Sequence, residues 1–293
     1  MKKIAVIGSI NMDMTAVSER IPRPGETISA KSLRYIPGGK GANQAVAASR
    51  LGGDVTMFGC VGDDAFGVKL IDNLKDNGIN TDFIRTIPGE SSGLAMIVVA
   101  ENDNAITVIP GANALVSAEY IDSNWNEIIR SDIILLQNEI PEETIIYVIN
   151  RLYAEDKTII YNPAPARLSD KTIIDKVSFF TPNEHEARIV LGDDITDIRE
   201  LIGKYNGKMI VTLGSKGVAG YDGGYILIPA IKANVVDTTG AGDTMNGAFA
   251  YALSAGMSYR EALAFANTAA GIATEKEGAQ AGIPTRAEVE NRL

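Results

Sequence analysis

The chain alternates short β-forming runs with stretches of helical periodicity, and this alternation constrains its fold more than any other feature. Ile4–Ile7 precedes a helical pattern from Ala42 to Leu51, and a run at 55–61 precedes another near 68–77. Such repeated pairs indicate βαβ units, so we predict an α/β fold with a mostly parallel central sheet, in one domain spanning residues 1–293. Beyond residue 130 we expect strands at 133–136, 158–161 and 209–212, and helices at 142–153, 184–191, 243–254 and 260–273.

Two segments break the alternation, at about residues 13–36 and 92–109. The second has two apolar runs on either side of the polar residues 101–104, which predicts a β-hairpin. Strands without helices to cover them indicate a small sheet that stands apart from the main core. We expect this sheet to be a lid inserted within one continuous fold, or a surface for dimerisation.

Composition excludes several classes of function. Lys and Arg number 27 against 37 Asp and Glu, a net charge of −10 that would repel nucleic acid over most of the surface. With Cys60 and His185 the only cysteine and histidine, a metal would have to be held by oxygen ligands. No stretch reaches the 18 or so apolar residues that cross a bilayer, so we expect a cytoplasmic protein without membrane or nucleic-acid partners.

The segment from residue 237 to residue 249 joins a glycine-rich turn to the start of an apolar helix. Gly240 and Gly242 lack a Cβ atom, so the turn can bend sharply and bring backbone N–H groups to an anion at the helix N-terminus. Asp243 lies in the first helical turn, where it can meet a hydroxyl group. We interpret the segment as a phosphoryl-transfer site, although an ordinary helix N-cap would have the same residues.

A second glycine-rich turn, residues 37–44, opens the first predicted helix. It is not a Walker A loop, because Lys40 is followed by Gly41 and no strand is expected directly before the turn. Lys40 and Asn43 are candidate ligand contacts there, with a tight helix entry as the alternative. Asn11 and Asp13 lie two residues apart beyond the first strand, at the edge of the sheet where α/β proteins bind ligands.

Residues 181–186 fit a capping box, with Thr181 as N-cap and Glu184 three residues later. This leaves Asn183 and Glu186 unexplained on one helical face, where their oxygen atoms could orient waters around Mg²⁺. Three further loops follow predicted strands and suit a ligand, at 137–139, 162–166 and 212–217.

Taken together, these motifs resemble the ribokinase-like (PfkB) family of sugar and nucleoside kinases, over essentially the whole chain. The resemblance implies a three-layer α/β sandwich with a small β lid, ATP as phosphoryl donor, Mg²⁺ and a potassium-like ion. It makes Asp243 the base, and Gly240, Ala241 and Gly242 the anion-hole backbone. The sugar would be held by Asn11, Asp13, Gly39, Lys40, Asn43, Glu139 and Asp243, and the nucleotide by Asn183, Thr212, Gly214, Ser215, Gly217, Gly242 and Asn267. Glu186 would act on magnesium through water, and the monovalent ion would be held by Asp237 and Thr239 with backbone oxygens of Ala273, Lys276, Gly278 and Gly282.

The resemblance further implies that the chain phosphorylates the 5-hydroxyl of D-ribose. Deoxyribose, fructose and nucleosides remain alternative acceptors, because the sequence does not position the lid side chains. A catalytically silent sugar-binding regulator on the same scaffold is a third alternative, disfavoured by the intact Asp243 and glycine turn. We expect a homodimer that forms through the lid sheet.

Overall fold

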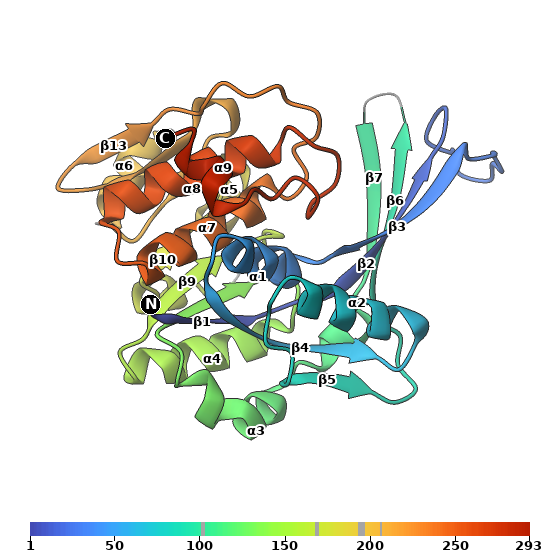
Figure 1. The fold of residues 1–293 in the computed structure, drawn as a ribbon, viewed down its shortest axis with the longest axis horizontal. Helices are drawn as coiled ribbons and strands as arrows, with labels where there is room; N and C mark the ends of the chain where they lie inside the picture. The colour runs from blue at the N-terminus through green and yellow to red at the C-terminus, as the bar shows by residue number, and fades with distance from the viewer. Residues whose placement is uncertain (101–102, 168–169, 193–196, 206) are drawn as a thin grey trace.

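A parallel sheet of six strands forms the centre of the computed structural model, which describes residues 1–100, 103–167, 170–192, 197–205 and 207–293 (Figure 1). All five neighbouring pairs of strands run parallel, as expected from repeated βαβ units. The predicted fold class is therefore confirmed. In spatial order the strands are β10 (Phe179–Phe180), β9 (Thr158–Asn162), β8 (Ile133–Gln137), β1 (Lys3–Ile7), β4 (Asp54–Gly62) and β5 (Ile84–Ile87).

Helices cover both faces of the sheet because its strands are apolar on both sides. In β1, Ile4 and Val6 face one buried cluster, whereas Ala5 and Ile7 face the other. The first cluster is closed by α1 (Lys40–Arg50), α2 (Ala65–Asp76), α7 (Ala241–Ser254), α8 (Tyr259–Ala273) and α9 (Arg286–Glu290). The second is closed by α3 (Ala118–Ile128), α4 (Glu142–Ala154), α5 (Glu184–Leu191), α6 (Ile198–Lys204) and the 3₁₀ turns η1 (Gly111–Leu115) and η2 (Lys171–Lys176).

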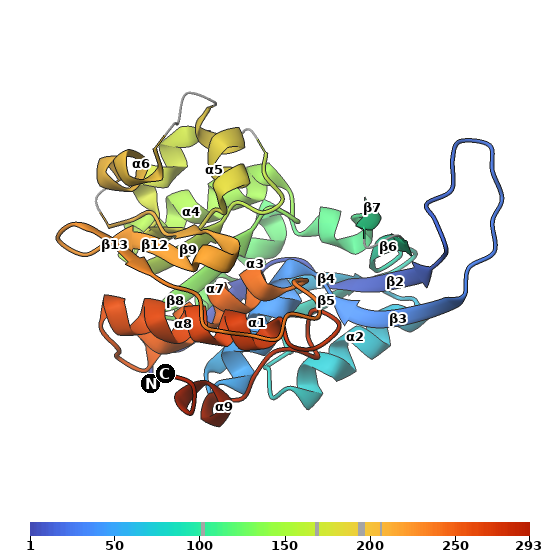
Figure 2. The same cartoon turned by 90° about the horizontal axis from the view of Figure 1, so that it is seen from above.

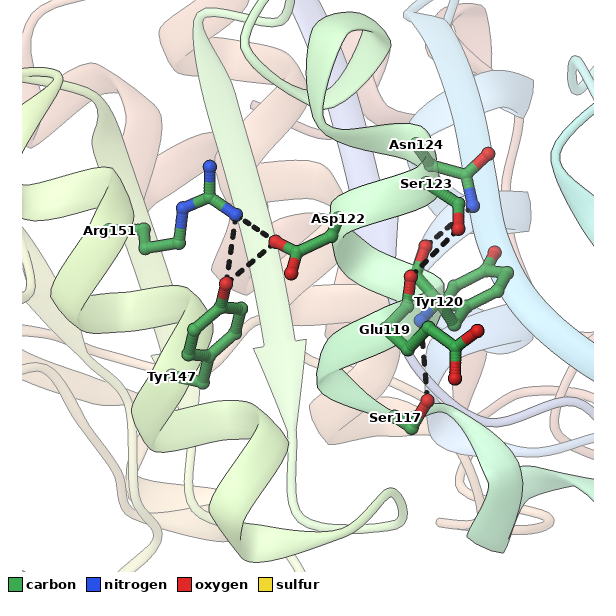
Figure 3. Close-up of polar contacts among 8 residues, drawn as sticks. All are labelled: Ser117, Glu119, Tyr120, Asp122, Ser123, Asn124, Tyr147 and Arg151. Atoms are coloured by element: carbon green, nitrogen blue, oxygen red, sulfur yellow. Dashed lines mark hydrogen bonds and ion pairs between the residues drawn. The ribbon is translucent and has the colours of Figure 1, made fainter.

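The α3 helix occupies a stretch for which the sequence pattern predicted no element. Its N-cap is Ser117, whose side chain accepts a hydrogen bond from the amide of Tyr120. Figure 3 shows how α3 is joined to α4: Asp122 accepts a hydrogen bond from Tyr147 (2.6 Å) and forms an ion pair with Arg151. These contacts fix the two helices against each other on the face of the sheet away from α1 and α7.

A separate four-stranded sheet, here called the lid sheet, has the order β3-β2-β6-β7 and stands beside the helical layers (Figures 1 and 2). Its register divides the side chains between two faces. Asp13, Ile36 and Val108 lie on one face, and Leu33 and Met96 on the other. The strands are β2 (Asn11–Val17), β3 (Ser32–Gly38), β6 (Gly93–Ala100) and β7 (Asp103–Ile109), and the predicted polar turn lies partly outside the described residues.

The chain passes between the lid sheet and the central fold four times, each time beside a glycine. The passages are next to Gly8, Gly39, Gly93 and Gly111. One expectation is wrong at this junction, because β3 runs directly into the turn before α1. The strand was missed because Pro37 and Gly38 at its end are typical of a turn, and because its first four residues are all exposed, so no buried face marks it.

A third sheet extends the central one beyond β10. It consists of β11 (Val211–Thr212), β12 (Val218–Tyr221) and β13 (Tyr225–Ile228), with the 3₁₀ turn η3 (Gly214–Lys216) after β11. Isolated bridges link Phe180 to Met209 and Asn183 to Thr212. The strand predicted at 209–212 is thus present in a shorter form. Among the helices of the described residues, none combines the length and apolarity needed to cross a membrane.

Candidate active site

The α7 helix begins at the predicted glycine turn, and the structure shows why glycine is needed at its cap. Gly240 is the N-cap with φ 76°, and a Cβ atom there would lie 2.8 Å from the Cα of Ala279. A Cβ at Gly242 would meet nothing within 4 Å, so this residue leaves open space above the helix start. The amide of Ala241 donates to the carbonyl of Thr238 (3.2 Å), so it helps to close the turn itself.

Asp243 in the first turn of α7 is only 6% exposed, and both of its carboxylate oxygens accept hydrogen bonds from α1. Asn43 Nδ2 donates to Oδ2 (3.0 Å), and Gln44 Nε2 donates to Oδ1 (3.1 Å). Charge-assisted hydrogen bonds of this kind fix the direction of a carboxylate. The two glycine motifs, about 200 residues apart in sequence, therefore meet at one acidic side chain.

Glu139, just after the end of β8, accepts hydrogen bonds from the segments that connect the central fold with the lid sheet. Its Oε2 atom accepts hydrogen bonds from Ser9 Oγ (2.6 Å), the Lys40 amide (3.0 Å) and Asn11 Nδ2 (3.4 Å). Asn11 Oδ1 in turn accepts from Asn113 Nδ2 (2.7 Å). The structure thus brings together Asn11, Lys40 and Glu139 of the expected sugar set.

Two neighbouring glycines make room for this arrangement. A Cβ at Gly38 would lie 2.3 Å from Oδ2 of Asp13, so the Asp13 carboxylate rests against the bare backbone there. Gly39 has φ 88°, and a Cβ at that position would lie 2.7 Å from the amide nitrogen of Asn11. Asp13 and Gly39 therefore adjoin the same site, and neither glycine can carry a side chain without displacing it.

Electrostatic interactions link the acidic side chains of the site to a single lysine. Burial, together with the nearby charges of Glu139 and Asp243, raises the pKa of Asp13 to about 7, and Lys40 opposes this shift. The pKa of Lys40 is raised above its usual value, chiefly by Asp243, although burial acts in the opposite direction. Glu139, Glu186 and Asp13 add to the increase, so four acidic side chains act on the Lys40 ammonium.

A cavity of about 210 Å³ lies where these groups meet. Lys40 and Asp243 line it together with the glycine turn and the start of α5. Its complete lining is Lys40, Asn162, Ala164, Thr181, Asn183, Glu186, Thr212, Thr238, Gly240, Gly242, Asp243 and Asn246. A smaller cavity of about 170 Å³ lies toward the lid and includes Asn11, Val108 and Glu139.

The expected nucleotide residues divide into two groups. Asn183, Thr212 and Gly242 line the larger cavity. The other four, Gly214, Ser215, Gly217 and Asn267, are not among the residues that line it. Gly217 packs in the turn before β12, where a Cβ would lie 2.0 Å from the Ile228 carbonyl, and Asn267 donates to the carbonyl of Pro229 (2.8 Å).

The capping box predicted at Thr181 is wrong, and the one present two residues later involves the candidate ligand residues themselves. Asn183 is the N-cap of α5; its Oδ1 accepts from the Glu186 amide (2.8 Å), and Glu186 Oε2 accepts from the Asn183 amide (2.9 Å). The β-bridge from Asn183 to Thr212 keeps the chain extended up to that point. Burial raises the pKa of Glu186, whereas its hydrogen bond with Asn183 and the charge of Lys40 lower it.

Contacts link five of the six residues expected to hold a monovalent ion, and the sixth, Lys276, lies between Ala273 and Gly278 in sequence. Asp237 accepts hydrogen bonds from the amides of Thr239 (2.9 Å) and Gly278 (2.8 Å), which joins the α7 turn to the C-terminal loop. Burial raises the pKa of Asp237, but hydrogen bonds from Thr239 and Gly278 outweigh it and leave the pKa below its usual value. The Ala273 carbonyl lies against Gly282, where a Cβ would be 2.1 Å away. Carboxylate and carbonyl oxygens are a donor set that fits a hard cation.

Several residues of the site received no role from the sequence. Ser9 and Gln44 contact Glu139 and Asp243, and Asn246 donates to the Gly242 carbonyl (2.9 Å) while accepting from Thr181 (2.6 Å). Each lies within or beside a glycine motif, yet its type alone gives no sign of which way it points. Proximity to a motif was the only available signal.

The sheet edge with its buried carboxylate, glycine turn and lysine defines an α/β enzyme suited to phosphoryl transfer onto a small hydroxyl compound. A family model described as pfkB family carbohydrate kinase matches residues 1–286, so the chain belongs to this family of carbohydrate kinases. The resemblance inferred from the sequence is confirmed.

Individual relatives are similar over the full length. The chain is 46% identical over 295 aligned residues to a ribokinase of Bacillus subtilis (strain 168), covering 100% of both sequences. The structure of ribokinase from Thermotoga maritima has a TM-score of 0.92 and 37% identity, covering 100% of this chain and 99% of that one. Arabidopsis thaliana ribokinase complexed with ribose and ATP has a TM-score of 0.91 and 33% identity, covering 99% and 98%.

Proposed function

We propose that this chain transfers the γ-phosphoryl group of ATP to the 5-hydroxyl of D-ribose. The observation that carries the proposal is the position of Asp243, whose carboxylate lies at a helix start, in one cavity with Lys40 and the glycine turn. The ribokinase names of full-length relatives and the ribose and ATP of the Arabidopsis complex support the donor and the acceptor.

Asp243 acts as the general base. Its oxygens are oriented by Asn43 and Gln44, so a sugar hydroxyl in the cavity meets a carboxylate of fixed direction, which takes the proton as the phosphoryl group arrives. The N-terminus of α7 beside Gly240 and Gly242 stabilises the negative charge that develops on the phosphoryl oxygens. Lys40 adds a positive charge at the same place.

The remaining sugar hydroxyls are bound by the residues around Glu139. Asn11, Asp13 and Gly39 come from the lid side, and Lys40, Asn43 and Glu139 from the central fold. Carboxylates and amides offer several acceptors and donors to a small polyol. Closure of the lid over the sugar excludes water, which would otherwise accept the phosphoryl group.

ATP binds along the start of α5 and the end of β11, where Asn183, Thr212 and Gly242 line the larger cavity. We assign Gly214, Ser215, Gly217 and Asn267 to the same nucleotide, beyond the residues that line the cavity. Among the described residues, no three His, Cys, Asp or Glu side chains form a ready-made metal centre. Mg²⁺ bound mainly by phosphate and water fits this pattern, and Glu186 orients those waters. When bound, Mg²⁺ supplies neutralising charge on the phosphates.

A monovalent cation, K⁺ in our proposal, binds between the α7 turn and the C-terminal loop. Its ligands are Asp237 and Thr239 with backbone oxygens of Ala273, Lys276, Gly278 and Gly282. The hydrogen bonds that already join Asp237 to Thr239 and Gly278 preorganise this site beside the anion-binding turn.

An acceptor panel tests the proposed reaction. ATP consumption is measured with ribose, deoxyribose, fructose and nucleosides, and ribose is expected to have the highest kcat/KM. A preference for another acceptor would replace ribose with that compound, and absence of turnover together with tight sugar binding would identify a silent regulator.

In parallel, Asp243→Ala is expected to lower kcat about 100-fold or more with little change in sugar binding, whereas Asp63→Ala, at an exposed position, leaves kcat unchanged.

The protein forms a homodimer through the outer face of its lid sheet, by which we mean the face opposite Asp13. Leu33 and Met96 lie on this face and are 51% and 43% exposed. A second copy would remove these apolar side chains from water. Sedimentation at micromolar concentration should give a dimer, and the double variant Leu33→Glu/Met96→Glu a monomer. Leu227→Glu, at an exposed position in β13, serves as the control and should remain dimeric.

A further inference from the structure

Gln44 has a position in the site that its place in the glycine motif does not explain. It is fully buried in α1, and its Nε2 atom donates to Asp243 Oδ1 (3.1 Å). Asn43, the neighbouring residue, contacts the other carboxylate oxygen and is an expected sugar ligand. Gln44 therefore touches the proposed base, and its complete burial leaves it no exposed surface for a substrate.

The direction of the Gln44 amide is determined by its surroundings. An ionised carboxylate only accepts hydrogen bonds, so the nitrogen of Gln44 must face Asp243. Its oxygen then faces Gln137 at the end of β8, and Gln137 Nε2 donates to it (2.8 Å). Gln44 Nε2 also lies 3.3 Å from Oδ1 of Asn162, the last residue of β9. Side chains at the ends of β8 and β9 thus fix the Gln44 amide, which in turn orients the Asp243 carboxylate.

This arrangement is costly for a role in packing alone. Gln137 is fully buried, and its Oε1 atom has no hydrogen-bond partner within the described part of the chain, although apolar residues could fill the same space. A Cβ at Gly8 would lie 2.0 Å from that oxygen, so a glycine in the backbone makes room for the Gln137 amide. The series of hydrogen bonds from Gln137 through Gln44 to Asp243 therefore keeps one donor-to-acceptor direction even though a buried oxygen is left unpaired at its start. This indicates that the direction of the hydrogen bonds is important for the orientation of Asp243.

We propose that Gln44 is a positioning residue, which, with Gln137 behind it, fixes the orientation of the Asp243 carboxylate for proton transfer. The inference rests on the proposed role of Asp243 as base. The chain from Gln137 through Gln44 ties the carboxylate to the rigid central sheet, so its direction does not depend on the lid or on the bound sugar. Misorientation of a catalytic group affects the rate of the chemical step more than the binding of substrate.

Two substitutions of Gln44 test this role. Gln44→Met preserves the length of the side chain and removes the donor to Asp243, and we expect kcat to fall about tenfold or more while the KM for ribose changes less than about twofold. Gln44→Glu keeps an acceptor for Gln137 and places a second carboxyl against Asp243. The two acids then share a proton, so the acidic limb of the kcat–pH profile should move to higher pH.

Controls separate positioning from loss of stability. Ile149→Ala removes a buried side chain of α4 on the other face of the sheet, and should lower the melting temperature without changing kcat. If both Gln44 variants retain the wild-type kcat and pH profile, or if kcat and sugar KM change together in proportion, the positioning role is wrong. Asp243→Ala is measured alongside: if that variant keeps its kcat, the proposed base is wrong, whereas loss of its kcat with unaffected Gln44 variants overturns this inference alone.

Discussion

Asp13→Asn should make the free protein more stable, and increasingly so as the pH rises. The pKa of Asp13 is raised from 3.8 to about 7 by burial and by the charges of Glu139 and Asp243, against the opposing charge of Lys40. The folded state therefore binds the Asp13 proton more tightly than the unfolded state does. The stability that this proton provides is complete below about pH 4 and is lost as the pH rises through about 7.

The size of the effect follows from the difference between the two pKa values. At about 1.4 kcal/mol for each pH unit, ionised Asp13 costs the folded state roughly 4 kcal/mol above pH 8 as an upper bound. Between pH 5 and pH 8 the advantage of Asp13→Asn should grow by about 2.5 kcal/mol. With an unfolding entropy of about 2.1 cal/mol/K per residue, this equals a relative gain of about 4 °C in melting temperature.

Thermal unfolding followed by circular dichroism, without ligands, measures this gain at both pH values. Titrating groups distant from Asp13 are common to the two proteins and cancel in the difference, whereas Glu139, Asp243 and Lys40 interact with Asp13 and are part of the measured effect. Asp63→Asn removes an exposed carboxylate and should show no pH-dependent gain. A melting-temperature difference between Asp13→Asn and the wild type that is equal at pH 5 and pH 8, or that becomes unfavourable at pH 8, would refute the reasoning. The more stable variant should also bind ribose less tightly, because it loses an anionic acceptor.

Three other substitutions test contacts around the site. Gly240→Ala should lower both the melting temperature and kcat, the latter by about tenfold, since its Cβ would meet Ala279 and left-handed backbone costs about 1–2 kcal/mol; an unaltered kcat would contradict this. Arg34→Glu should raise the ribose KM by less than about threefold, because it breaks the exposed ion pair of Arg34 with Glu277 between the lid sheet and the C-terminal loop. Adding Glu277→Arg restores the ion pair with reversed charges and should return the KM to the wild-type value. A double variant whose KM does not recover would show that the ion pair has no role in sugar binding. Asp237→Ala should abolish the dependence of kcat on K⁺ over Na⁺, and a retained dependence would place the ion elsewhere.

Much of the fold could be predicted from local pattern. Residues 184–191 were predicted as a helix and form α5, because buried residues recur there at helical spacing. The α3 helix was missed although the sequence carries a local signal for it: Ser117 is an N-cap, and the buried Tyr120, Ile121 and Ile128 recur at helical spacing among polar residues. The stacking of Arg151 from α4 over Trp125 at 3.7 Å belongs to tertiary structure and could not be predicted from local pattern.

The sequence predicted which segments form the site, but not the directions in which their side chains point. Glycine and acidic residues in 237–243 indicated the place where Asp243 would lie, and only the combination with the other motifs favoured a phosphoryl-transfer site over an ordinary helix N-cap. The contacts of Gln44 and Ser9 depend on how α1 lies against β8, which the sequence does not express. The β-bridge from Asn183 to Thr212 similarly delays the start of α5, so the predicted cap at Thr181 was two residues too early.

The four glycine-flanked passages between the lid sheet and the central fold divide the enzyme into two parts that can change separately. The lid strands contribute Asn11 and Asp13, whereas the turn that carries Asp243 belongs wholly to the helical layer. New acceptor preferences can therefore be selected or engineered by exchanging residues 11–38 and 93–109 as a cassette, with the phosphoryl-transfer machinery inherited intact.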